Sequence, residues 1–167
     1  MIKLNIFIEN AYEEYEIDEV SVYNDTVKMA DAVFSDKNLI EKSCLLNHKF
    51  KSVCFDIVLV KNDDIRRINR EYRNKDAYTD VITFAVFADS PSNEQFIIDG
   101  EINLGEIIIS LDRIEEQTAE NKVSFRDELY FIISHGMLHL LGFDHQTEDD
   151  YNFMVSYQKK VKALVLN

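Results

Sequence analysis

HGMLHLLGFDH, residues 135–145, contains three of the four histidines of this 167-residue chain. His135 and His139 are four residues apart, so on a helix they lie on one face about one turn, or ~6 Å, from each other. Gly142 follows where the helix should end, and glycine readily takes the left-handed conformation that turns the chain back. His145 comes three residues later. The stretch therefore predicts a helix, a bend and three imidazoles that converge on one point.

Three imidazoles with an open fourth position are typical of catalytic zinc sites, whereas structural zinc sites are usually closed by four protein ligands. We therefore predict one Zn²⁺ ion, or another divalent metal, held by His135, His139 and His145. The spacing is also that of the zinc-binding stretch of the metzincin peptidases, in which a catalytic glutamate follows the first histidine. Gly136 stands at that position here, so the sequence disfavours a zinc peptidase. Asp144 either orients one ligand or faces solvent.

The residues around this stretch predict two consecutive helices. Ser124 begins a capping box, and the apolar run 129–141 is long enough for a largely buried helix that ends at Gly142. Thr147 and the three acidic residues after it then start a second helix, which we expect to reach about Val165. Its inward row is predicted at Tyr151, Met154, Val161 and Val165.

Strand patterns dominate the earlier two thirds of the chain. Residues 3–10 alternate between polar and apolar side chains, and residues 13–17 form either their hairpin partner or a loop. Three more strands are predicted, from β-branched and aromatic residues, at 52–60, 81–87 and 106–111. Two helices are predicted as well, one with its N-cap at Asn24 or Asp25 and one over residues 112–121.

This order of elements favours an α+β fold over a regular alternation of strands and helices. The chain has one proline and four glycines, and it shows no repeat or linker that would mark a domain boundary. We therefore predict a single domain over residues 1–167, with a mixed sheet, helices packed mainly on one face, and a zinc-binding helix as in zincin-like folds.

The composition limits the classes of function. The chain is 46% hydrophobic and 29% charged, which is typical of one globular domain with a real core. It has no signal-peptide pattern and no run of 18 apolar residues, so we expect a cytoplasmic protein that does not associate with membranes. Cys44 and Cys54 are expected to be reduced core thiols, and His48 has no ligand partners nearby. The net charge of −13 argues against a protein that coats nucleic acid.

Positive charge gathers instead in residues 61–75. They hold six basic and three acidic side chains, a local charge of +3. If Asn62 or Asp63 caps a helix here, its buried stripe is predicted at Ile65, Ile68 and Tyr72 and its arginine face at Arg66, Arg70 and Arg73. Such a pattern alone is typical of a solvated helix face. Beside a metal site, however, guanidinium groups suit the charge of a phosphodiester.

These stretches resemble a known family. HGMLHLLGFDH matches the H-G-x-L-H-L-x-G-[YF]-D-H signature of the bacterial YbeY family, the metal-dependent endoribonucleases of ribosomal RNA maturation. INREYRNKDAYTDVITF (68–84) and LGEIIIS (104–110) resemble two further family stretches in the same order, so the resemblance covers about residues 53–151. Three residues depart from the usual family pattern, with Tyr78 in place of Pro, Thr83 in place of Ser and Glu106 in place of Asp.

The resemblance implies an α+β fold, single-stranded RNA as substrate, zinc on the three histidines and a functional arginine at Arg73. We therefore predict a zinc-dependent, single-strand-specific endoribonuclease that acts in 16S ribosomal RNA 3′-end processing and in ribosome quality control. Its expected partners are the small ribosomal subunit and assembly factors, and not DNA. His135 and Arg73 are the predicted catalytic residues, and Arg70, Arg73 and Lys75 are predicted to bind substrate.

Several alternatives stay open on the residues alone. The attacking group is either water or the RNA 2′-hydroxyl, and no residue is assigned as the general base. A non-catalytic ribosome-assembly factor with a structural metal site would use the basic segment equally well. A zinc peptidase is opposed by Gly136, and a metal hydrolase of another substrate would leave the basic segment without a role.

Overall fold

One mixed sheet forms the centre of the molecule in the computed structural model, which describes residues 2–166. Its strand order is β1-β2-β4-β3. Three neighbouring strands are parallel, and the short edge strand β3 runs antiparallel to β4. The strands are β1 (Lys3–Asn10), β2 (Ser52–Val60), β3 (Val81–Phe84) and β4 (Glu101–Ser110).

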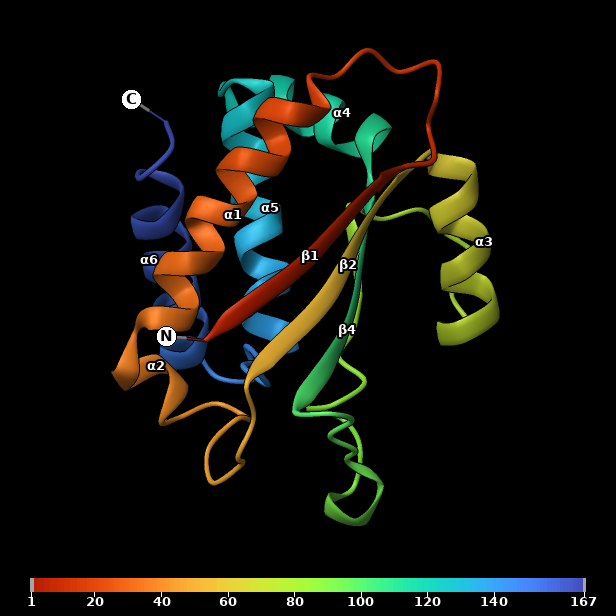
Figure 1. Cartoon of the computed structure of the whole chain (residues 1–167). Coiled ribbons are helices and arrows are strands. Elements are labelled where there is room, and N and C mark those ends of the chain that lie inside the picture. Colours follow the sequence, from red (N-terminus) through yellow and green to blue (C-terminus); the bar gives the residue numbers. More distant parts are fainter. Residues whose placement is uncertain (1, 167) are drawn as a thin grey trace.

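The helices cover the two faces of this sheet unequally. Figure 1 shows α1, α5 and α6 on one side and α3 alone on the other, so the predicted α+β fold with helices mainly on one face is confirmed. The helices are α1 (Glu19–Ser35), α2 (Lys37–Ile40), α3 (Asn62–Arg73), α4 (Leu111–Asn121), α5 (Phe125–Leu140) and α6 (Glu148–Lys162), with a 3₁₀ turn at Ser92–Glu94.

The main core lies between the sheet and α5. Ile133, Met137 and Leu138 of this helix are fully buried together with Ile107 and Ile109 of β4. A smaller cluster on the other face joins α3 to the sheet through Ile65, Val60, Ile82 and Ile108. Both faces of β4 are therefore buried, which explains the nearly unbroken apolar run near its end.

The helix α5 packs very closely on β4 at one point. A Cβ atom on Gly136 would lie 2.7 Å from Cγ2 and 2.8 Å from Cδ1 of Ile107, too close for any real side chain. Packing thus favours glycine at this position, because any Cβ atom would force the Ile107 side chain to shift.

Several boundaries differ from those expected from the sequence. The first helix begins at Glu19 and not after Asn24, because Asp18 caps it by accepting a 3.0 Å hydrogen bond from the backbone N–H of Ser21. Residues 13–17 are turn and loop, since β1 pairs in parallel with β2 and needs no hairpin partner. The strand β3 stops at Phe84, whereas β4 begins five residues early at Glu101, directly after a turn.

Two aromatic residues predicted to be buried are exposed. Tyr72 of α3 is 68% exposed and Tyr151 of α6 is 56% exposed. The helix α3 covers only part of its sheet face, so its last turn has no core beneath it, and Tyr72 packs edge-on against Phe84 with ring centroids 5.4 Å apart. The α6 row is otherwise as predicted, with Met154 and Val161 buried, although the helix ends at Lys162. At its start, α3 is capped by neither Asn62 nor Asp63, because the N-cap position is Lys61.

Other features of the described chain agree with expectation. The helices predicted at 112–121, after Ser124 and after Thr147 are present with the expected caps at Ser124 and Thr147. Cys44 and Cys54 are free and partly buried, and burial raises the pKa of each thiol to about 11. None of the helices within residues 2–166 has the length and apolar character needed to span a membrane.

A double-mutant cycle at Gly136 and Ile107 tests the packing of α5 on β4. We expect Gly136→Ala alone to destabilise the fold by up to about 2 kcal/mol, because overpacking costs about 1–3 kcal/mol and alanine regains about 1 kcal/mol of helix propensity. In an Ile107→Ala background the clash is removed, so the same substitution should stabilise the fold by up to about 1 kcal/mol. Urea denaturation of the four proteins measures both effects, and equal effects in the two backgrounds would contradict the contact.

Candidate metal centre and active site

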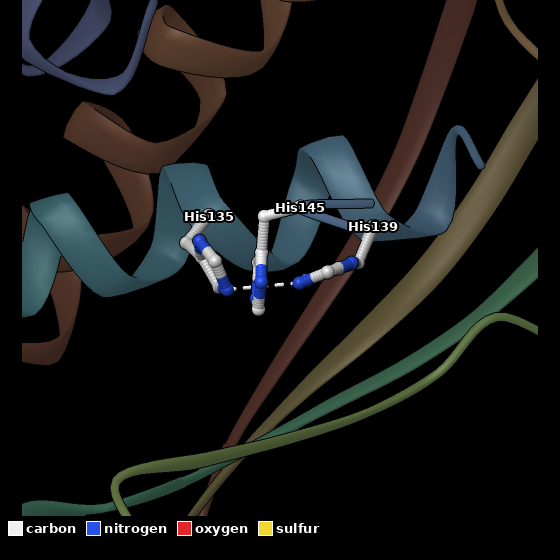
Figure 2. A group of neighbouring side chains, drawn as sticks. All are labelled: His135, His139 and His145. Carbon is white, nitrogen blue, oxygen red and sulfur yellow. Dashed lines mark hydrogen bonds between the residues drawn. The ribbon is translucent and has the colours of Figure 1, made fainter. Parts of the chain in front are cut away.

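The three histidines come from one helix end and the loop that follows it. His135 and His139 project from α5, which begins at Ser124, where the hydroxyl oxygen accepts a 3.1 Å hydrogen bond from the backbone N–H of Asp127. The chain then turns at Gly142, whose φ of 93° is left-handed. Figure 2 shows His145 returning so that its ring stands between the other two. The predicted helix, bend and returning histidine are therefore confirmed.

The imidazoles converge closely enough to share one ion. One ring nitrogen from each of His135, His139 and His145 lies within 4.8 Å of the other two. The Nε2 atoms of His135 and His139 are 2.8 Å apart, and the dashed line in Figure 2 joins them. Such a contact is a hydrogen bond when one Nε2 carries a proton, and a metal ion can take the place of that proton.

The surroundings keep two of these imidazoles neutral. Burial, together with the charges that His135 and His145 can carry nearby, lowers the pKa of His139 to about 4. The pKa of His135 is lowered as well, because the effect of burial exceeds that of a hydrogen bond to Gln158, which raises it. At neutral pH each of these two rings is therefore neutral, with one nitrogen that carries a proton and one that has a free lone pair. Three imidazole nitrogens at this spacing fit a divalent metal such as zinc, whose usual ligands in catalytic sites are neutral histidines.

A cavity of about 610 Å³ opens in front of the histidines. Arg73, at the end of α3, and Thr83, on β3, line this cavity together with His135 and His139. The Arg73 guanidinium donates a 3.4 Å hydrogen bond to the backbone carbonyl of Thr83 and stays exposed to solvent. The structure thus brings the end of the basic segment to the histidine cluster, although the two are some sixty residues apart in the chain.

The other predicted basic residues lie outside this cavity. Arg70 and Lys75 are exposed, and neither is among the described residues that line it. The Arg70 guanidinium lies 3.8 Å from the carboxylate of Asp76, which also accepts two hydrogen bonds, at 2.9 and 3.2 Å, from Arg66. The arginine face of α3 is therefore partly neutralised by Asp76, and among its arginines Arg73 alone lines the cavity.

Three carboxylates also line the cavity, those of Asp80, Asp89 and Asp144. Asp144 accepts hydrogen bonds from the backbone N–H of His145 (2.8 Å) and from Gln146 (3.3 Å), and these contacts lower its pKa. It therefore shapes the loop that carries His145, and its side chain is exposed. Asp80 accepts hydrogen bonds from the backbone N–H of Val81 (2.7 Å) and from Gln117 of α4 (3.1 Å).

Sequence reasoning missed Asp80 and one buried residue of α6. Gln158 is only 1% exposed, and its Oε1 atom lies 3.2 Å from Nδ1 of His135. Asp80 lies within residues 68–84, which resemble a stretch of the family, and that resemblance was the available signal for it. Gln158 interrupts an otherwise apolar inward row, Met154 and Val161 being its buried neighbours on the helix, and this break in the row was the available signal.

Comparison with known proteins gives consistent results. The family model described as "Endoribonuclease YbeY" matches residues 7–165. A Fusobacterium nucleatum protein named endoribonuclease YbeY is 39% identical over 152 residues, which cover 91% of this chain and 81% of the relative. Its Bacillus subtilis namesake is 48% identical over 107 residues, 63% of this chain and 68% of the relative. A solution structure from Thermotoga maritima has the same fold, with a TM-score of 0.59 and 24% identity over 96% of this chain and 89% of that one.

The low pKa of His139 predicts how the stability of the metal-free protein depends on pH. The pKa of this ring falls from an ordinary 6.5 to about 4 on folding. Between these values the unfolded chain binds more protons, so stability should decrease as the pH is lowered from 6.5 towards 4. His139→Asn should make this loss smaller, whereas His48→Asn, outside the cluster, should not. Urea denaturation at pH 7, 6 and 5 in the presence of a chelator measures this loss of stability. Parallel pH profiles for wild type and His139→Asn would contradict the low pKa of His139.

Proposed function

The chain belongs to the endoribonuclease YbeY family, and on that premise we propose that it is a metal-dependent endoribonuclease that cleaves single-stranded RNA during ribosomal RNA maturation. The observation that carries this proposal is the cavity that three converging imidazoles share with Arg73. A Lewis acid and a fixed positive group near the same phosphate both accelerate phosphodiester cleavage, because they stabilise the charge that develops on its oxygens. This cavity offers ligands for the first and Arg73 as the second.

We assign His135, His139 and His145 as the metal ligands, with one zinc ion or another divalent metal as the cofactor. A divalent ion held there would supply Lewis acidity to a phosphodiester oxygen or to water. His135 acts in catalysis as a ligand of that ion, and Arg73 binds the scissile phosphate and neutralises its developing charge. The peptidase alternative is weakened further by Ile107, which leaves no room for a glutamate side chain at position 136.

Arg70 and Lys75 are proposed to bind phosphates of the same RNA strand outside the cavity. Both lie in the last turn of α3 or just after it, next to Arg73 in the chain. Arg70 must give up its contact with Asp76 to do so, and exposed pairs of this kind are worth only about 0–1 kcal/mol. Replacing the Asp76 contact of Arg70 with a phosphate contact therefore costs little free energy.

The net charge of −13 limits the affinity of this chain for RNA in general, because few phosphates can be neutralised. We therefore propose that the small ribosomal subunit and its assembly factors deliver the substrate, the 3′ end of 16S ribosomal RNA, in the cytoplasm. Quality control of ribosomes would use the same cleavage. Residues 1–167 would form one endoribonuclease domain for this task.

Cleavage of RNA by the purified, metal-loaded protein is the direct test. We expect wild type to cut single-stranded RNA, and both His135→Ala and chelator treatment to abolish the cuts, because each removes the metal. His48→Ala, a histidine outside the cluster, is the matched control and should retain full activity. If every sample degrades RNA alike, a contaminant is responsible and the proposal fails. The end groups identify the attacking group, since a 2′,3′-cyclic phosphate indicates the 2′-hydroxyl.

Arg73→Ala tests the role of the guanidinium. Loss of one charge-stabilising donor commonly lowers kcat by about 10²–10³, and we expect a fall of that order with zinc content unchanged. Arg67→Ala is the control, because Arg67 is exposed on the same helix and pairs with Asp64, 3.6 Å away. An Arg73→Ala protein that loses RNA binding, together with a wild type that never cleaves RNA, would favour the non-catalytic assembly factor.

A further inference from the structure

We propose that Gln158 is a positioning residue that holds His135 in the tautomer whose Nε2 lone pair faces the cluster, and that it thereby couples the docking of α6 to metal binding. The inference rests on the proposed function in one respect only, the assignment of His135 as a metal ligand. It concerns a residue on a different helix from the ligand that it positions.

The orientation of the Gln158 amide follows from its partners. Its Nε2 lies 3.1 Å from the backbone carbonyl oxygen of Phe131, which can only accept hydrogen bonds. The NH₂ group must therefore point at Phe131, one helical turn before His135. The amide oxygen then points the other way, towards Nδ1 of His135 at 3.2 Å.

The amide oxygen in turn decides the imidazole tautomer. An amide oxygen can only accept, so Nδ1 of His135 must carry the proton and donate it. In a neutral imidazole the other nitrogen then has a free lone pair. That nitrogen, Nε2, lies 2.8 Å from Nε2 of His139 and faces the point where the three rings converge. The opposite tautomer would place a hydrogen where a metal ion has to bind.

The position of Gln158 in the core makes this contact rigid. Its side chain is 1% exposed, and its neighbours one turn away on α6, Met154 and Val161, are 1% and 2% exposed. These apolar side chains hold α6 against the core, so the amide has little freedom to rotate away. A buried amide without hydrogen-bond partners is destabilising, and both ends of this amide find their partners on α5. An apolar residue would fill the same space but would leave the His135 ring free to flip.

Coupling between α6 and the metal is reciprocal. If docking of α6 improves metal affinity by orienting His135, metal binding must favour docked α6 by the same factor. The loop from His145 to the N-cap Thr147 adds a second connection between the cluster and this helix. Zinc should therefore slow hydrogen exchange of α6 amides, and removing the Gln158 contact should reduce that effect.

The first measurement needs no variant. In wild-type, metal-free protein, ¹⁵N NMR of the imidazole rings should show the His135 proton on Nδ1. A proton on Nε2 instead would overturn the proposal, whatever the variants do. RNA is absent from this experiment, so failure of the proposed endoribonuclease activity would leave its result unaffected.

The second measurement is zinc affinity by competition with a chromophoric chelator. Loss of a group that orients a metal ligand typically weakens binding by about 10–100-fold, and we expect this for Gln158→Leu. Gln158→Glu keeps an acceptor for Nδ1 and should stay within several-fold of wild type. Val161→Ala, a core truncation on the same helix that leaves the Gln158 amide in place, controls for general loosening of α6 and should weaken zinc binding clearly less than Gln158→Leu does. Equal zinc affinity in Gln158→Leu and wild type, or equal losses in Gln158→Leu and Val161→Ala, would overturn the proposal.

Discussion

The close packing of α5 on β4 is the contact on which the position of the site depends. Where Gly136 meets Ile107, the helix lies directly against the sheet. His135 and His139 lie roughly 60–100° around the helix from Gly136, both to the same side. Thr83, which lines the cavity, is the cross-strand partner of Ile107 on β3. One helix–sheet contact therefore directs two histidines towards the edge strand, where Arg73 also arrives from α3.

The parts of the site that lie close together in the sequence could be predicted from it. His135, His139, Gly142 and His145 span eleven positions, and helical geometry with a left-handed glycine relates them almost without tertiary information. The position of Arg73 near the histidines could not be predicted from local sequence alone, because it depends on how α3 and β3 are placed. Its local charge made it a candidate, and the family resemblance singled it out. The break in the apolar row of α6 could mark Gln158 as unusual, but its contact with His135 depends on the packing of α6 against α5, which no local pattern specifies.

The boundaries that were wrong also have tertiary or capping causes. Asp18 starts α1 early because a carboxylate cap there is followed by Val22, which the core buries. The buried stripe predicted on α3 was one helical turn too long. Periodicity shows which side chains share a face of the helix, but not how far the sheet extends beneath them. Tyr72 thus lies beyond the part of the sheet that buries Ile65. Amphipathic spacing therefore shows which side of a helix is buried, whereas the element that packs against it determines how many turns are buried.

Charge in the cavity gives a physical reason for the metal. Asp80, Asp89 and Asp144 carry three formal negative charges on its wall, and Arg73 carries one positive charge, which leaves a balance of −2. Such a cavity repels a phosphodiester, and the acidic character of the whole chain adds to the repulsion. A divalent ion on the three histidines would bring the formal balance to zero and place its charge on the lining of the cavity. The ion would then do two things at once, since it would supply Lewis acidity and would also make the cavity accept an anion that the protein alone rejects.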